Sequence, residues 1–200
     1  MNNYEYIIAS LPEITTDWKF SDKRPEDYIE EIESLCSAKD LKTIAFLKEG
    51  LSDGNLTKDF YLAAASHHDK FIREYFLFDM NVRNGKVRFL NSALGRSAGK
   101  DVMDLPGGEF EESARLESIL ADKDILSRER GIDDLMWDKI NELTVFNYFD
   151  IDAILGFIAK LQIVARWFKL DEEAGREMFR KLVDEVRGTF SGVRFDDTNK

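Results

Sequence analysis

The run from Thr57 to about Gly95 most constrains the fold, because its apolar residues recur at the spacing of one broad helical face. Upstream of position 80 the pattern follows the helical period better than strand alternation, and the pattern from 89 to 94 does the same. We therefore predict one long helix here. Its apolar face would comprise Phe60, Tyr61, Ala64, Phe71, Ile72, Tyr75, Phe76, Phe78, Val82, Phe89, Leu90 and Leu94.

One dipeptide in this run conflicts with a helix. Asn84-Gly85 lies between Val82 and Val87, and an Asn-Gly pair flanked by alternating residues is a strong β-hairpin signal. Glycine inside a helix costs on the order of 1 kcal/mol relative to alanine, which a helix with a bend would tolerate. We favour a helix because both flanking segments keep the helical period. A hairpin remains the alternative.

The rest of the sequence favours an all-α fold built as a bundle of long helices. Only 3 prolines and 12 glycines interrupt 200 residues, and 34% of the residues are charged. Such a composition is typical of long helices with solvent-exposed faces. The segment 4–11 is compatible with a short strand or a helix. We expect further helices at about 25–35, 41–47, 109–121, 125–143 (or from 131), 151–168 and 171–187.

Glycines and a proline gather between positions 95 and 108, which makes this stretch the best candidate for a linker. We predict an N-terminal helical half over 1–95, a Gly-rich linker over 96–108 and a C-terminal helical half over 109–200. One continuous domain is the alternative.

The charge balance excludes some classes of partner. The net charge is −11 and the sequence pI is about 4.8. Phosphate binding requires clustered Lys and Arg, so nucleic acid is not expected as the main partner. Docking on an anionic membrane surface is disfavoured for the same reason. A protein partner with a basic patch remains compatible with this charge.

Cysteine content and apolar runs indicate the compartment. Cys36 is the only cysteine, so neither an internal disulfide nor a zinc site with several cysteines can form. The N-terminus lacks the basic and apolar regions of a signal peptide. No apolar run approaches about 18 residues, so no membrane span is expected. We expect a cytoplasmic protein.

Two motifs suggest chemistry and fail on spacing. His67-His68-Asp69 offers three metal ligands in a row, but neighbouring residues of a helix diverge by about 100°. The glycine loop 95–101 approximates a Walker A motif. It has three residues between its glycines instead of four, Asp101 in place of a hydroxyl, and no preceding buried strand. We predict no catalytic, cofactor or metal site.

Polar side chains on two predicted helices are candidates for binding. Asn81, Asn84, Arg88 and Asn91 follow spacings of three, four and three, which places them on one helical face. This face is either an ordinary solvent face or one that binds another subunit or forms internal hydrogen bonds. In the apolar helix over 151–168, the polar residues Lys160, Gln162 and Arg166 could extend to solvent or meet carboxylates of a partner.

Three segments together resemble an uncharacterised bacterial family that is encoded among V-type ATPase subunits. The start, Tyr4-Glu5-Tyr6-Ile7-Ile8-Ala9-Ser10-Leu11-Pro12, is similar to a family start that reads Tyr-Tyr-x-Leu-Val-Ala-Ser-Leu-Pro. The long helix is similar through Phe71, Arg73, Tyr75, Asn81, Arg83 and Asn84. The third segment runs from Phe157 to Ile163 and continues with Arg166-Trp167 and Leu170-Asp171.

This resemblance implies a non-catalytic part of a V-type or A-type rotary ATPase. Operons of this kind lack a recognisable gene for the stalk-to-rotor adaptor, an all-helical protein that joins the central stalk to the membrane rotor ring. The resemblance implies a shortened substitute for that adaptor, although the known adaptors repeat a helical module three times and no such repeat occurs here. The implied partners are the stalk and rotor subunits. The implied location is cytoplasmic, peripheral to the inner membrane.

Overall fold

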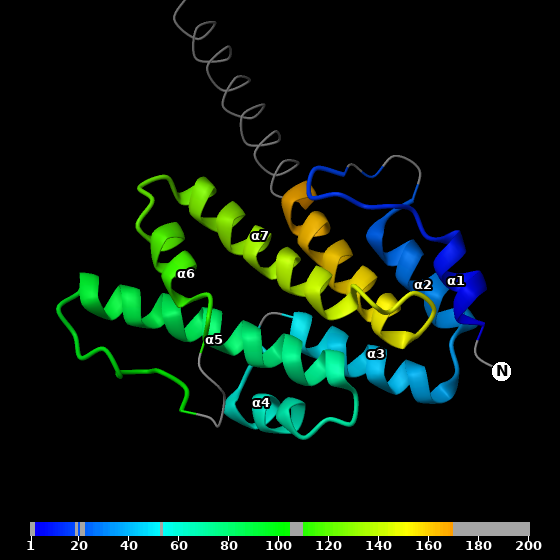
Figure 1. Ribbon diagram of the computed structural model, residues 1–200, viewed down its shortest axis with the longest axis horizontal. Helices are drawn as coiled ribbons and strands as arrows, with labels where there is room; N and C mark the ends of the chain where they lie inside the picture. Colours follow the sequence, from blue (N-terminus) through cyan, green and yellow to red (C-terminus); the bar gives the residue numbers. More distant parts are fainter. Residues whose placement is uncertain (1–2, 19, 21–22, 53, 105–109, 170–200) are drawn as a thin grey trace, which may run out of the picture.

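A computed structural model describes residues 3–18, 20, 23–52, 54–104 and 110–169 (Figure 1). Within these ranges the chain forms helices and no strands, which confirms the all-α prediction. The helices are α1 (Tyr4–Ser10), α2 (Pro25–Leu35), α3 (Ala38–Leu51), α4 (Lys58–Ala65), α5 (Lys70–Ala93), α6 (Ser113–Leu120) and α7 (Ile125–Thr144).

Residues 151–169 form a further helix, which we call the 151–169 helix. Asp150 caps its start, since its Oδ1 accepts the Ala153 amide at 3.1 Å, as the sequence predicts. The segment 4–11 is helical in α1 rather than a strand. The helix predicted over 171–187 lies outside the described residues.

The long run after Thr57 is two helices rather than one, so that prediction is wrong in this respect. Helix α4 ends at Ala65, and α5 begins at Lys70. Asp69 caps α5, because its buried side chain accepts the Ile72 amide at 3.1 Å. The apolar period continues through the break because α4 packs against α5, so both helices present apolar residues to the same core.

Asn84-Gly85 lies inside α5, which confirms the helix and excludes the hairpin. Gly85 has a packing role there. A Cβ at this position would overlap Cδ2 of Leu116, a fully buried residue of α6. The missing side chain therefore lets α6 approach α5 closely, and this contact offsets the low helix propensity of glycine.

The bundle is organised around α5 and α7, which run side by side across the molecule (Figure 1). Helix α4 packs on α5, and α6 contacts both α5 and α7. The 151–169 helix follows α7 through a short loop and lies beside it (Figure 1). None of the described helices combines the length and apolarity needed to cross a bilayer.

One apolar cluster includes buried residues from both predicted halves, from Ile7 of α1 to Ala159 of the 151–169 helix. In α3, the predicted inward positions Leu41 and Ala45 are exposed. That helix instead buries Thr43, Ile44, Leu47 and Gly50. The largest fully buried side chains elsewhere include Phe71, Phe76, Leu135, Ile140, Ile154 and Leu155.

Candidate functional site

The polar face predicted on α5 is only partly open. Asn84 and Asn91 are buried and bind the backbone of the loop that follows α5. The Asn84 carboxamide donates to the Met103 carbonyl and accepts the Met103 amide, both at 2.9 Å. Asn91 Nδ2 donates to the Lys100 carbonyl at 2.7 Å. Asn81 is half-buried and Arg88 is exposed, so partner binding by this face stays a prediction that depends on these two residues.

The two histidines lie in the connection between α4 and α5, so the expectation that they belong to a helix is wrong. His67 Nδ1 accepts the Asp69 amide at 3.1 Å, and its ring lies 4.9 Å from that of Phe46. Burial lowers the pKa of His67. Asp69 is engaged as the cap of α5. In the described part of the chain, no three His, Cys, Asp or Glu side chains are grouped so that they could hold a metal.

The glycine loop 95–101 follows the C-terminal end of α5. A phosphate loop instead leads into the N-terminus of a helix, where free amides face the phosphate. Here Gly95 and Asp101 have positive φ angles of 64° and 60°, and the loop closes back on α5 through Asn91 and Asn84. The loop therefore serves to cover α5.

A groove of about 720 Å³ opens between α5, α7 and the 151–169 helix. Its charged side chains pair with one another. Glu129 of α7 lies 3.5 Å from Lys86 and 3.6 Å from Arg166, and Arg83 pairs with Asp79 at 2.8 Å. Because these ion pairs join the three walls, we assign the groove charges to the fold. The apolar lining includes Phe76, Val82, Ile132, Met136, Ala159 and Ile163.

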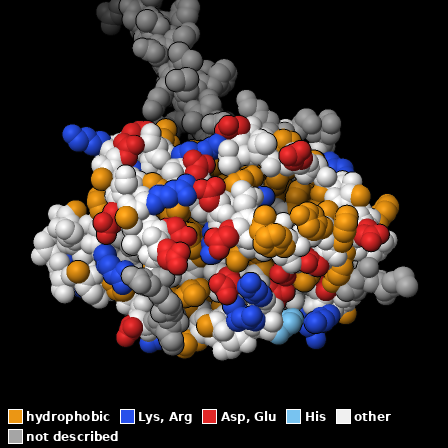
Figure 2. Space-filling model, viewed as in Figure 1, with side chains coloured by type: hydrophobic (Ala, Val, Ile, Leu, Met, Phe, Trp, Pro, Cys, Tyr) orange, Lys and Arg blue, Asp and Glu red, His pale blue; other side chains and the backbone are white. Residues whose placement is uncertain are grey.

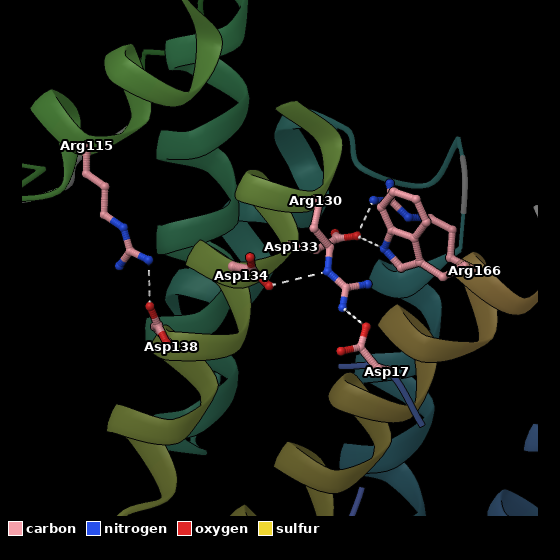
Figure 3. A network of polar contacts seen from close by, with 8 residues as sticks. Asp17, Arg115, Arg130, Asp133, Asp134, Asp138 and Arg166 are labelled. Carbon is pink, nitrogen blue, oxygen red and sulfur yellow. Dashed lines mark hydrogen bonds and ion pairs between the residues drawn. The ribbon is translucent and has the colours of Figure 1, made fainter. Parts of the chain in front are cut away.

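Two sides of α7 carry different polar contacts (Figure 3). On the inner side, Asp133 is buried and accepts hydrogen bonds from Arg166 and from Trp167 Nε1. Burial raises the pKa of Asp133, although Arg166 opposes this effect. Arg166 thus meets a carboxylate of its own chain, and Lys160 lies over the Trp137 ring at 5.1 Å. Gln162 is exposed.

The outer side of α7 carries an acidic stripe, formed by Asp134, Asp138 and Glu142. These residues are spaced by four positions, so they lie on one face of the helix. Their side chains are 47%, 56% and 61% exposed. Each has one surface ion-pair partner, namely Arg130, Arg115 and Lys139 (the first two pairs are drawn in Figure 3). Exposed pairs of this kind leave the carboxylates accessible to water and to other cations.

The acidic stripe leads to an aromatic loop, residues 145–149, between α7 and the 151–169 helix. Val145, Phe146, Tyr148 and Phe149 are 53%, 84%, 67% and 58% exposed. Figure 2 shows hydrophobic side chains gathered over this loop, with Asp and Glu side chains over α7 beside it. Single exposed apolar residues are common, but contiguous apolar patches mark interaction sites. We take the aromatic loop and the acidic stripe together as the candidate functional site.

Polar contacts hold the base of the aromatic loop. Asn147 Nδ2 donates to Asp150 at 2.6 Å, and Asp150 in turn caps the 151–169 helix. Asp152 approaches Asp69 at the start of α5, and the two carboxyl groups share a hydrogen bond. Burial, followed by the charges of Asp69 and Asp150, raises the pKa of Asp152 to about 6. The loop therefore stands on an anchored base that carries excess negative charge.

Our sequence reasoning did not identify this site, although signals for it were present. The run Val145-Phe146-Asn147-Tyr148-Phe149 joins two predicted helices and carries four apolar residues where a polar connection is usual. The spacing of Asp134, Asp138 and Glu142 is also visible in the sequence. Only the structure shows that the loop residues point to solvent instead of into the core.

The fold and this site define an all-helical protein with an exposed aromatic and acidic surface. Residues 94–189 match a family described as "Protein of unknown function (DUF2764)", so the candidate site lies within the matched segment. No curated protein and no solved structure matches the chain.

Proposed function

We propose that this chain is a non-catalytic subunit or accessory protein of a V-type or A-type rotary ATPase, acting as an adaptor between central stalk and membrane rotor. The observation that carries an adaptor role is the exposed aromatic loop 145–149. The ATPase assignment rests on the sequence resemblance. An adaptor with this role would be cytoplasmic and held at the inner membrane by its partner subunits.

The aromatic loop has the properties of a protein-binding hot spot. Aromatic side chains contribute much of the binding energy of interfaces, because they bury large apolar areas at low entropic cost. Phe146 is 84% exposed, so a partner that covers it would gain roughly 1.5–3 kcal/mol from that side chain alone. The hydrogen bond from Asn147 to Asp150 keeps the loop close to one geometry, which lowers the entropic cost of binding.

Affinity purification tests the proposal. The tagged protein is isolated from its native cells, and retained ATPase stalk and rotor subunits are identified by mass spectrometry. We expect the wild type to retain them and a Phe146→Ser, Phe149→Ser variant to lose them. A Leu126→Ser variant is the matched control, because Leu126 is 63% exposed at the opposite end of α7. A wild-type protein that retains no ATPase subunit would refute the proposal.

An unrelated helical adaptor or regulator is the second candidate, because the same exposed loop would serve any protein partner. The purification separates the two candidates. Retention of one defined set of non-ATPase proteins, lost in the Phe146→Ser, Phe149→Ser variant and kept in the Leu126→Ser variant, would favour this second function.

A further inference from the structure

We infer that the element bound by the aromatic loop and the acidic stripe is a cationic amphipathic helix of a partner protein. This inference rests on the proposed function in one respect, namely that this surface binds a protein. It goes further by assigning the chemistry and the secondary structure of the partner element. The inference depends on the charge, the spacing and the position of the stripe and the loop.

The charge of the site is strongly one-sided. From Asp134 to Asp152 the sequence contains five carboxylates and one lysine, Lys139. The ion pairs along the stripe only partly compensate this excess. Arg130 lies 3.7 Å from Asp134 and also pairs with Asp17, so it is shared between two carboxylates. A partner that supplies Lys or Arg would therefore complement this surface.

The base of the loop adds negative charge from other elements. Asp150 and Asp152 follow the loop, and Asp69 reaches it from the start of α5. Lys70 is the cation that acts on Asp152. The raised pKa of Asp152 reports unneutralised repulsion among these carboxyl groups. An incoming cation would relieve this repulsion, whereas an anionic partner would increase it.

The spacing of the stripe fits a helical partner. Successive members lie about 6 Å apart along α7, because each residue of a helix advances about 1.5 Å. A partner helix with Lys or Arg at every fourth position would present cations at the same interval. Its apolar face would reach the aromatic loop at the end of the stripe. A helix with both features is amphipathic and cationic.

Charge also argues against two other occupants of the surface. A second copy of the chain would bring together two acidic stripes on proteins with a net charge of −11 each. An anionic membrane surface would meet the same repulsion. The partner helix therefore belongs to a protein with a basic patch.

Binding of designed peptides tests the inference. The probes are two labelled helical peptides of about 18 residues, long enough for roughly five turns. One alternates leucine faces with lysine and the other with glutamate. Fluorescence anisotropy would give the two affinities at low salt and at about 0.5 M salt, where screening is strong. We expect the lysine peptide to bind at least about tenfold more tightly at low salt, and the difference to shrink at high salt.

Two variants assign the binding to this surface. Glu142→Lys reverses one charge of the stripe, and Phe146→Ser removes the most exposed ring of the loop. Each should weaken the lysine peptide about fivefold or more. Asp59→Lys makes the same change of net charge on α4, which lies across α5 from α7 (Figure 1), and should leave binding unchanged. Circular dichroism would verify that all variants keep the helical fold.

The outcomes separate this inference from the proposed function. Equal binding of the two peptides, or equal effects of Glu142→Lys and Asp59→Lys, would overturn the inference. So would self-association in sedimentation that Phe146→Ser abolishes, since a second copy would then be the occupant. If ATPase subunits are still retained by the Glu142→Lys protein, the adaptor proposal survives and the cationic-helix inference fails.

Discussion

The Asn84 side chain on α5 closes both backbone groups of Met103. Its Nδ2 donates to the Met103 carbonyl and its Oδ1 accepts the Met103 amide, each at 2.9 Å. A carboxamide can do this because it carries a donor and an acceptor side by side. The pair holds the loop after α5 against the helix and leaves the buried Asn84 side chain satisfied.

Replacing Asn84 by aspartate should destabilise the protein. An Asn84→Asp side chain keeps the acceptor for the Met103 amide but turns the donor into an anionic oxygen that faces the Met103 carbonyl. We expect a loss of about 2 kcal/mol in the free energy of unfolding, measured by urea denaturation. Asn81→Asp, at a half-buried position of the same helix, should cost less than about 0.5 kcal/mol. Equal costs would show that the bonds to Met103 contribute little.

Two helical glycines should respond differently to alanine. A Cβ at Gly50 would overlap the rings of Phe60 and Phe76, which are both buried, so the core would have to shift. A Cβ at Gly85 would meet only the end of the Leu116 side chain. We expect Gly50→Ala to cost about 2–3 kcal/mol. Gly85→Ala should cost at least about 1 kcal/mol less, because alanine is the better helix former. Thermal and urea unfolding would measure both costs.

The carboxyl group of Asp152 should make stability depend on pH. Its pKa is about 6 in the folded protein, against an ordinary value of 3.8, so the folded state holds this proton at pH values where the unfolded chain has lost it. Stability from this group is therefore present below about pH 4 and is lost as pH rises through about 6. Asp152→Asn should remove this dependence and stabilise the protein at about pH 7 by roughly 1–2 kcal/mol, a value reduced for partial solvent exposure.

Urea unfolding at several pH values between about 4 and 8 would test this prediction. Asp138→Asn is the control, because it removes an exposed carboxylate of the acidic stripe. Parallel pH profiles of the Asp152→Asn variant and the wild type would contradict the prediction.

Removing Arg166 should cost more than neutralising its partner. Arg166→Met leaves the buried Asp133 carboxylate with Trp167 Nε1 as its remaining side-chain donor, and an uncompensated buried charge costs about 3 kcal/mol or more. Asp133→Asn keeps an acceptor for Trp167 and removes the buried charge, so its cost should be smaller. Urea unfolding gives the two costs. A larger loss for Asp133→Asn would contradict this order.

Removing an aromatic ring from the loop should leave the fold intact. Phe146 is 84% exposed, so Phe146→Ser should change the free energy of unfolding by less than about 0.5 kcal/mol. Phe76→Ala, in the core, should cost about 3–5 kcal/mol. A large loss of stability in Phe146→Ser would mean that the ring packs within the chain, and would remove the basis for the binding site.

The helices were largely predictable, because capping residues and apolar periodicity act locally. Pro25, Asp150 and the spacing around Phe71 to Phe76 each indicate helix without knowledge of the rest of the chain. The break between α4 and α5 escaped prediction, since Asp69 acts as a cap only where the chain turns. Helical period alone does not reveal such a turn when both helices face one core.

The candidate site was less predictable, because exposure is a property of packing. Asn84, Asn91 and Arg88 share a helical face, yet a loop buries the two asparagines and leaves the arginine open. The sequence alone determined the helical class and the acidic charge, which follow from local propensity and composition. Only the tertiary structure decided that Phe146 faces solvent, that Arg166 meets Asp133, and that the acidic stripe ends at the aromatic loop. These relationships depend on which surfaces the packed helices leave uncovered.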